Sequence, residues 1–166
     1  EQVAGNLTDH FDPRTNVVRL SQSVYNVPSI AAVGVAAHEC GHAVQYAVGY
    51  GPMKLRAAII PATNFGSKLA LPLILIGLLF NSSQLLLAGI LLFSLTAVFQ
   101  LVTLPVEFNA SSRALRTLDQ QGLLTQEELA GTRKVLTAAA LTYVAALLVA
   151  LAQLVRMLLL YNRRRD

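Results

Sequence analysis

Two long stretches without a charged residue constrain this chain more than any other feature of its sequence. A run of 38 uncharged residues separates Lys68 from Glu107, and another 21 separate Lys134 from Arg156. A membrane-spanning helix needs about 20 mostly apolar residues, so the first run is long enough for two spans and the second for one. Only 13% of the residues are charged, against about 25% in a typical soluble domain. We therefore expect a helical membrane protein and exclude an ordinary soluble or disordered chain.

A polar turn at Asn81-Ser82-Ser83 divides the first run. We predict spans at Ala57–Phe80, Gln84–Leu104 and Val135–Leu160, and the three spans belong to a single domain. In chain order its parts are an extramembrane segment (1–56), a two-span hairpin (57–104), a second polar segment with a helix and a loop (105–134) and the last span (135–160).

The N-terminal segment carries local signals for a small β-hairpin and one helix. Asp12-Pro13-Arg14-Thr15-Asn16 is typical of a turn, so Leu7–Phe11 and Val17–Leu20 are predicted to pair as strands. Ser29 can cap a helix over Ile30–Val48. The expected fold is therefore mainly α, with this hairpin beside the membrane helices.

The predicted helix contains His38-Glu39-Cys40-Gly41-His42, an HExxH motif. Residues four apart lie on one face of a helix, so both imidazoles can bind one zinc ion. Glu39 can then take a proton from the water that attacks a substrate. From the composition of this chain the motif arises by chance at roughly 0.2%. The alternative, two core histidines beside a buried carboxylate, would cost several kcal/mol, on the order of an unpaired buried charge.

A catalytic zinc ion usually has three protein ligands and a water. The extended pattern HExxHxxGxxH is not present, because Gln45 and Val48 occupy the positions of its glycine and third histidine. Topology favours Glu107, since two spans return the chain to the face that it left after His42. The other candidates are His10, Asp9, Asp12, Asp119, Glu127 and Glu128. Glu127 and Glu128 also belong to Thr125-Gln126-Glu127-Glu128, which fits the capping box of the last helix.

Four segments together resemble the YugP-like family of membrane zinc metallopeptidases. They are His38-Glu39-Cys40-Gly41-His42-Ala43-Val44-Gln45, Leu104-Pro105-Val106-Glu107-Phe108-Asn109-Ala110-Ser111, Leu7-Thr8-Asp9-His10-Phe11-Asp12-Pro13-Arg14 and Ala138-Ala139-Ala140-Leu141-Thr142-Tyr143-Val144-Ala145-Ala146. The resemblance implies one zinc ion held by His38, His42 and Glu107, with Glu39 as the catalytic base. It also implies a further membrane helix before Glu1.

Glu107-Phe108-Asn109-Ala110-Ser111 is also similar to the EFxAD element of HtpX-type and CAAX-prenyl membrane proteases. In those proteases the Asp orients a zinc-bound histidine, and Ser111 occupies its position here. Ser111 or Asn109 is therefore the predicted partner of a ligand histidine. His10 is predicted either to contact the substrate or to be structural. Val17-Val18-Arg19-Leu20 could pair as an edge strand with an extended peptide substrate or belong to an ordinary hairpin.

Basic residues gather on one side of the predicted spans, which favours a cytoplasmic position for the zinc site. Those before the first span or between the second and third are Arg14, Arg19, Lys54, Arg56, Arg113, Arg116, Arg133 and Lys134. The turn at Asn81-Ser82-Ser83 has no charge, whereas the tail Arg163-Arg164-Arg165 conflicts with this orientation.

The predicted function is a membrane-bound zinc endopeptidase in a bacterial cell membrane, with a peptide or protein substrate and the lipid bilayer as partners. Nucleic acid is not an expected partner, and the sequence predicts no oligomeric state. One alternative is an intramembrane protease of the site-2 type, which would need an Asp ligand from a span. Another is a non-catalytic membrane scaffold or chaperone partner stabilised by zinc, in which Glu39 has no role.

Overall fold

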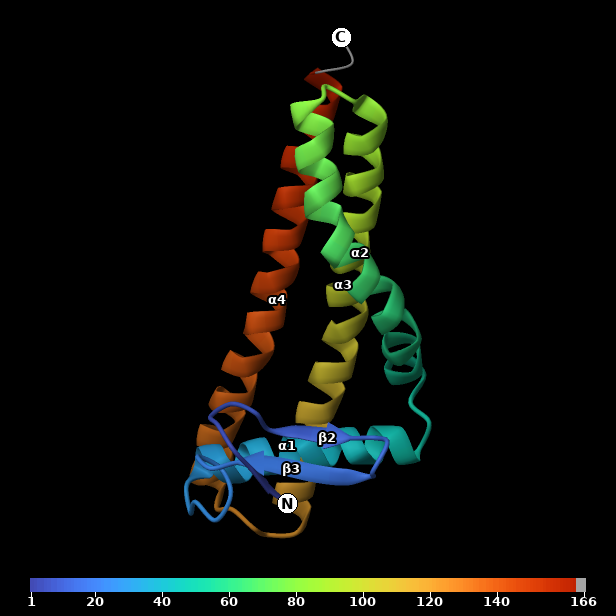
Figure 1. Cartoon of the computed structure of the whole chain (residues 1–166). Coiled ribbons are helices and arrows are strands. Elements are labelled where there is room, and N and C mark those ends of the chain that lie inside the picture. The colour runs from blue at the N-terminus through green and yellow to red at the C-terminus, as the bar shows by residue number, and fades with distance from the viewer. Residues whose placement is uncertain (164–166) are drawn as a thin grey trace. The chain divides into compact units, whose positions relative to one another are not determined.

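The computed structural model describes residues 1–163, which form three short strands followed by four helices (Figure 1). In chain order the elements are β1 (Gln2–Val3), β2 (His10–Asp12), β3 (Val17–Ser21), α1 (Ile30–Ala47), α2 (Gly51–Leu79), α3 (Ser83–Gln120) and α4 (Gln126–Arg163). The expected mainly helical fold with a small β element is confirmed. The predicted tail residues Arg164 and Arg165 lie outside the described residues.

The chain divides into two compact units. The first consists of Glu1–Lys54 and Leu104–Thr142, and the second of Leu55–Thr103 and the chain from Tyr143 onward. The helices α2, α3 and α4 each contribute to both units, so the first eight residues of the predicted third span, 135–142, belong to the first unit.

The predicted hairpin is present, but it is part of a three-stranded sheet. β2 pairs antiparallel with β3, and β1 pairs parallel with the other edge of β3. The first strand of the hairpin begins at His10 rather than at Leu7, because Leu7 has a positive φ of 58° that breaks the extended backbone. Since β3 is the central strand, the alternative in which Val17–Leu20 forms a free edge is wrong and the hairpin alternative holds, and the edge strands are β1 and β2.

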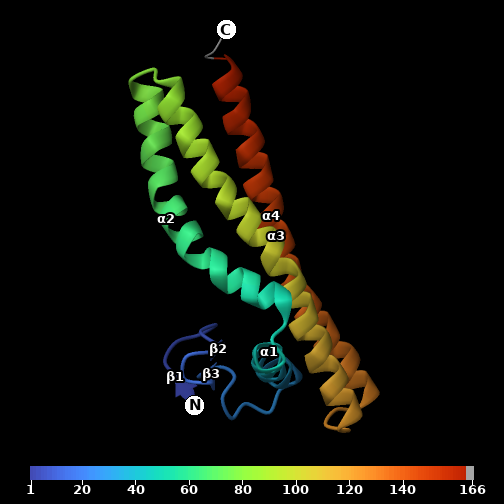
Figure 2. The ribbon, with the colours of Figure 1, turned by 90° about the vertical axis from the view of Figure 1, so that its right-hand side faces the viewer.

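Within the first unit, α1 lies between the sheet and the adjoining parts of α3 and α4, as the view along α1 shows (Figure 2). The Ser29 hydroxyl accepts a hydrogen bond from the Ala32 backbone N–H at 3.1 Å and so caps α1, as predicted. Phe11 of β2 packs against Tyr46 of α1, with ring centroids 5.7 Å apart. These contacts fix the face that α1 presents to α3.

The second unit is a group of three apolar helical segments whose contacts depend on small residues. A Cβ added at Gly77 of α2 would lie 2.6 Å from the backbone nitrogen of Leu86, and one at Gly89 of α3 would lie 2.9 Å from the Ala70 carbonyl oxygen. Small residues allow helix backbones to approach closely in membranes. Ile74, Leu86 and Ile90 form the buried core beside this contact.

α2, α3 and α4 are each long and apolar enough to cross a membrane. All three extend beyond the predicted spans, and α2 begins at Gly51 rather than at Ala57. α3 continues through Pro105 to Gln120, so the second span and the segment that carries Glu107 form one helix. α4 begins with the predicted capping box, in which the Glu128 carboxylate accepts from the Thr125 backbone N–H at 2.8 Å and the Glu128 N–H donates to the Thr125 hydroxyl at 3.3 Å.

Candidate metal centre

His38 and His42 lie one turn apart on α1 and face the same side of the helix. Their ring centroids are 4.7 Å apart and their planes are nearly perpendicular, at 86°. Spacing along the helix brings the two rings together. The sequence therefore predicted correctly that both imidazoles share one face.

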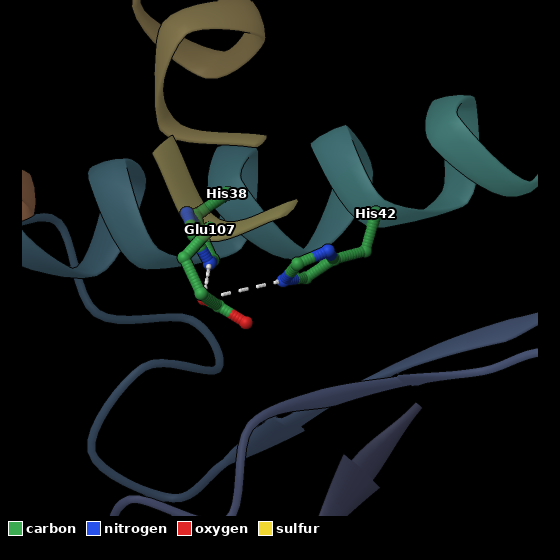
Figure 3. Close-up of side chains that lie close together, drawn as sticks. All are labelled: His38, His42 and Glu107. Carbon is green, nitrogen blue, oxygen red and sulfur yellow. Dashed lines mark hydrogen bonds and ion pairs between the residues drawn. The ribbon is translucent and has the colours of Figure 1, made fainter. Parts of the chain in front are cut away.

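Glu107 reaches this pair from α3, across 65 residues of sequence from His42 (Figure 3). Its Oε2 lies 3.2 Å from the Nε2 of His38 and 3.7 Å from the Nε2 of His42. One ligand atom from each of the three residues lies within 4.8 Å of the others. Around a tetrahedral zinc ion, ligand atoms lie about 3.3 Å apart, given metal–ligand bonds of about 2.0–2.2 Å. The donor types and their spacing thus fit a zinc site.

A close contact between backbones allows α1 to lie against α3 at this point. A Cβ added at Gly41 would lie 2.6 Å from the carbonyl oxygen of Ala110, too close unless one of the two backbones moves. Gly41 stands directly before His42 in the chain, and Ala110 is three residues after Glu107. The glycine inside the HExxH motif therefore sets how near the two ligand-bearing helices come.

The second ring nitrogen of each histidine has its own partner. The Nδ1 of His38 lies 3.0 Å from the Ser111 hydroxyl, and the Nδ1 of His42 lies 2.9 Å from the Oε1 of Gln45. Such bonds orient ligand histidines. Ser111 was a predicted partner, whereas Gln45 was considered only because it replaces a motif glycine.

Asn109, the other predicted partner, is linked to His42 only through Gln45, from whose side chain it accepts a hydrogen bond at 3.0 Å within the described residues. Its Oδ1 also accepts from the Nε of Arg113 at 2.8 Å. Gln45 in addition donates to the carbonyl oxygen of Val106 at 2.7 Å. These bonds connect the C-terminal half of α1 to the segment of α3 that carries Glu107.

Glu39 is buried beside the three donors. Burial raises the pKa of its carboxyl group above the ordinary value of 4.5, and the charge of Glu107 acts in the same direction. His42, His38 and a hydrogen bond from the backbone of Phe11 oppose this rise. A carboxylate with a raised pKa accepts a proton more readily near neutral pH.

His42 responds to the same surroundings. Burial alone would lower the pKa of its ring, but the hydrogen bond and charge of Glu107 outweigh burial, so the pKa lies above 6.5. The bond to Gln45 adds to this rise. The charge of Glu107 therefore favours the protonated form of the His42 ring.

The remaining candidate ligands do not join this group among residues 1–163. His10 is exposed on β2, where its Nδ1 lies 2.8 Å from the carbonyl oxygen of Thr8. Asp9 accepts a hydrogen bond from Ser21, and Asp12 forms an ion pair with Arg19. Asp119 accepts a hydrogen bond from Gln126. Glu128 caps α4, and Glu127 is exposed in the first turn of that helix. The contact of His10 with a substrate stays a prediction.

Comparison with known proteins places the chain in a family. The model of a family described as "Putative neutral zinc metallopeptidase" matches residues 1–162, so the chain belongs to that family. The chain is also 51% identical over 166 residues to the "Putative membrane protease YugP" of Bacillus subtilis (strain 168), a match that covers 100% of this chain and 74% of that protein. No solved structure shows a significant match to the chain. The resemblance stated from the motifs is confirmed.

Proposed function

We propose that the protein is a membrane-bound, zinc-dependent endopeptidase in which His38, His42 and Glu107 bind the metal. The observation that carries the proposal is the convergence of two imidazoles and one carboxylate within 4.8 Å. The Glu107 residue is only 3% exposed, and burial of a carboxylate is costly unless it is paired or coordinates a metal. Membership in a family of neutral zinc metallopeptidases supports zinc as the ion.

A bound zinc ion would polarise the scissile carbonyl group and lower the pKa of a water to about 7. Glu39 follows His38 directly and is buried beside the ligands. In the proposed reaction its carboxylate accepts a proton from the attacking water as the new C–O bond forms. Glu39 then delivers that proton to the amine nitrogen as the C–N bond breaks, which leaves a carboxylate and an amine as products.

The three-donor set favours catalysis over the scaffold alternative. A structural zinc site is closed by four protein ligands, whereas a catalytic site keeps one position open. Within the described residues the group of donors consists of three side chains. The site-2-type alternative needs an Asp from a membrane span, but the third donor here is Glu107, which belongs with both histidines to the first compact unit.

The proposed location is a bacterial cell membrane, which the protein crosses several times through α2, α3 and α4. The exposed apolar side chains of these helices would face lipid. A peptide or protein is the substrate that the reaction requires. The basic residues near the first unit favour a cytoplasmic metal site.

The direct test is metal analysis and a peptidase assay of the purified protein beside its Glu39→Gln variant. Glutamine keeps the shape of the side chain but accepts no proton, so we expect full zinc occupancy and a loss of about 10²–10⁴-fold in kcat. A Glu39→Gln variant that cleaves as fast as the parent would show that Glu39 is not the base. Glu107→Ala is expected to lower zinc occupancy sharply, and unchanged occupancy would remove Glu107 from the ligand set.

A further inference from the structure

Gln45 occupies an unusual position beside the candidate metal centre. It is 0% exposed, and its side chain makes three hydrogen bonds, to His42, Val106 and Asn109. A buried amide can bind in either of two orientations, so its neighbours decide which end faces His42. The Val106 partner is a backbone carbonyl oxygen, which only accepts. The NH₂ end of Gln45 must therefore face Val106, and the carbonyl end faces the Nδ1 of His42.

The orientation of Asn109 is determined in the same way. Arg113 can only donate, and its Nε points at the Oδ1 of Asn109 at 2.8 Å. That same oxygen accepts from the NH₂ group of Gln45 at 3.0 Å. The chain of bonds thus has a fixed donor at Arg113 and a fixed acceptor at Val106, and neither amide between His42 and these ends can be reversed without losing bonds.

From this arrangement we propose that Gln45 is a positioning residue that holds neutral His42 in the tautomer protonated on Nδ1. Because the Oε1 of Gln45 only accepts, the Nδ1 of His42 must carry a hydrogen whether the ring is charged or neutral. The hydrogen bond to Glu107 belongs to the protonated ring, and loss of that proton leaves the lone pair on Nε2, the nitrogen that lies 3.7 Å from the Glu107 carboxylate. Only an unprotonated ring nitrogen can bind a metal ion. The inference rests on the proposed function for its consequence, zinc binding, but its structural content concerns the metal-free protein.

His38 provides an internal contrast. Its Nδ1 contacts the hydroxyl of Ser111, and a hydroxyl can either donate or accept. Ser111 therefore orients the ring of His38 without deciding its tautomer. The two ligand histidines thus differ in how firmly their protonation is set, and His42 is the one that the fold determines.

The first experiment measures the tautomer directly. Protein labelled with ¹⁵N-histidine and stripped of metal is examined by NMR at increasing pH, until the spectrum itself shows that the ring of His42 has lost its second proton. We expect His42 in the Nδ1–H form in the parent and a shift towards the Nε2–H form in Gln45→Met, which has a similar size but no acceptor. A parent in which His42 is protonated on Nε2 would overturn the inference whatever the variants do.

The second experiment separates positioning from a general structural role, using zinc affinity by chelator competition and the absorption spectrum of the cobalt-substituted protein. Gln45→Met is expected to lower zinc affinity by about 10–100-fold, the usual cost of removing such a partner, and to change the cobalt spectrum. Gln45→Glu restores an acceptor for Nδ1–H but cannot donate to Val106, so it should regain most of the zinc affinity without regaining thermal stability.

Thr132 supplies the matched control. It is also fully buried in the first unit, and its hydroxyl lies within hydrogen-bond distance of the carbonyl oxygens of Glu128, at 3.0 Å, and of Ile30, at 3.3 Å, eight residues before His38. Thr132→Val should lower thermal stability and leave zinc affinity and the cobalt spectrum unchanged. If Gln45→Met, Gln45→Glu and Thr132→Val lose zinc affinity in proportion to their loss of stability, Gln45 is only structural and the inference is wrong.

Failure of the proposed function gives a different pattern. A parent protein that binds no zinc, or that binds zinc but cleaves no peptide, would contradict the endopeptidase proposal. The tautomer of His42 in the metal-free parent would still decide the role assigned to Gln45.

Discussion

At the scale of single residues, the hairpin depends on the charge of Asp12. Its carboxylate accepts from the Arg14 backbone N–H at 2.9 Å and from the Arg19 guanidinium at 2.7 Å. These two bonds, the backbone one first, hold the pKa of Asp12 well below its ordinary value of 3.8. A lowered pKa in the folded state means that the charged form contributes stability above about pH 3.8 and loses that contribution as the pH falls further.

We therefore predict that Asp12→Asn lowers the thermal unfolding temperature above pH 5 and that its difference from the parent shrinks by pH 3. Arg14→Gln is the matched control, because it keeps the backbone donor, the largest cause of the lowered pKa of Asp12, and removes only an exposed side chain that forms a weak ion pair with Asp12 at 3.6 Å. It should retain the pH dependence of the parent. A difference between Asp12→Asn and the parent that stays constant from pH 6 to pH 3 would contradict this account.

The residues of the metal site differ in how far a sequence can predict them. Glu107 could be predicted because two spans return the chain to its starting face and the motif at Leu104–Ser111 supports it. Gln45 could not, since a glutamine three residues after His42 has no meaning until the carbonyl oxygen of Val106 is placed beside it. That contact joins residues 61 apart in sequence, and no local pattern signals it.

At the scale of elements, the contact between α1 and α3 determines whether the three donors meet. We predict that Gly41→Ala destabilises the protein by about 1–3 kcal/mol, the usual range for overpacking. The new Cβ would meet the backbone of Ala110, which cannot move aside as a flexible side chain could. Zinc affinity should fall as well, because separation of the helices moves Glu107 away from His38 and His42.

Gly51→Ala is the control for this prediction. A Cβ at Gly51, at the start of α2, meets nothing within 4 Å, so the substitution should leave stability within about 0.5 kcal/mol and zinc affinity unchanged. Thermal unfolding in detergent and chelator competition measure the two effects. Equal behaviour of the two alanine variants would mean that the Gly41 contact does not control the site.

The sequence predicted the boundaries of a helix or strand where neighbouring residues alone determine them, as a capping side chain does. Ser29 caps α1 as predicted, and the helix ends at Ala47, one residue before the predicted Val48 and two before Gly49, whose φ is 65°. β1 was missed because Gln2–Val3 is too short for a pattern and is stabilised only by pairing with β3. The end of the second span was placed at Leu104, yet α3 runs on through Pro105, so the proline did not end the helix.

At the scale of the whole molecule, the second unit exposes many large apolar side chains. Large apolar side chains with more than half of their surface exposed include Phe65, Leu71, Leu75, Leu79, Phe80, Leu91, Leu101, Leu148, Val149, Val155 and Leu159. In water such a surface would promote association, whereas lipid solvates it. The polar metal centre belongs to the other unit. The exposed apolar side chains named above thus belong to the second unit, whereas the three candidate metal ligands belong to the first.

The orientation in the membrane can be tested with the single native cysteine. Cys40 is exposed on α1, and Ser83 is exposed at the start of α3, after α2. If α2 crosses the membrane once, these two positions lie on opposite sides. The distribution of basic residues places the Cys40 side in the cytoplasm. We predict that a membrane-impermeant maleimide labels a Cys40→Ala/Ser83→Cys variant in intact spheroplasts but labels Cys40 in the parent only after permeabilisation.

The side chain of Cys40 is accessible but partly surrounded by protein, and this partial burial, with the charge of Glu39, raises the pKa of its thiol. A raised pKa slows the reaction near neutral pH, so labelling is done at about pH 8.5, near the ordinary pKa of a thiol. Detergent-solubilised samples of both proteins provide the reference for full reaction. Labelling of Cys40 but not of position 83 in intact spheroplasts would reverse the orientation and place the metal site outside. Labelling of both positions from the same side would show that α2 does not cross, which would contradict the multi-pass arrangement on which the proposed location of the enzyme depends.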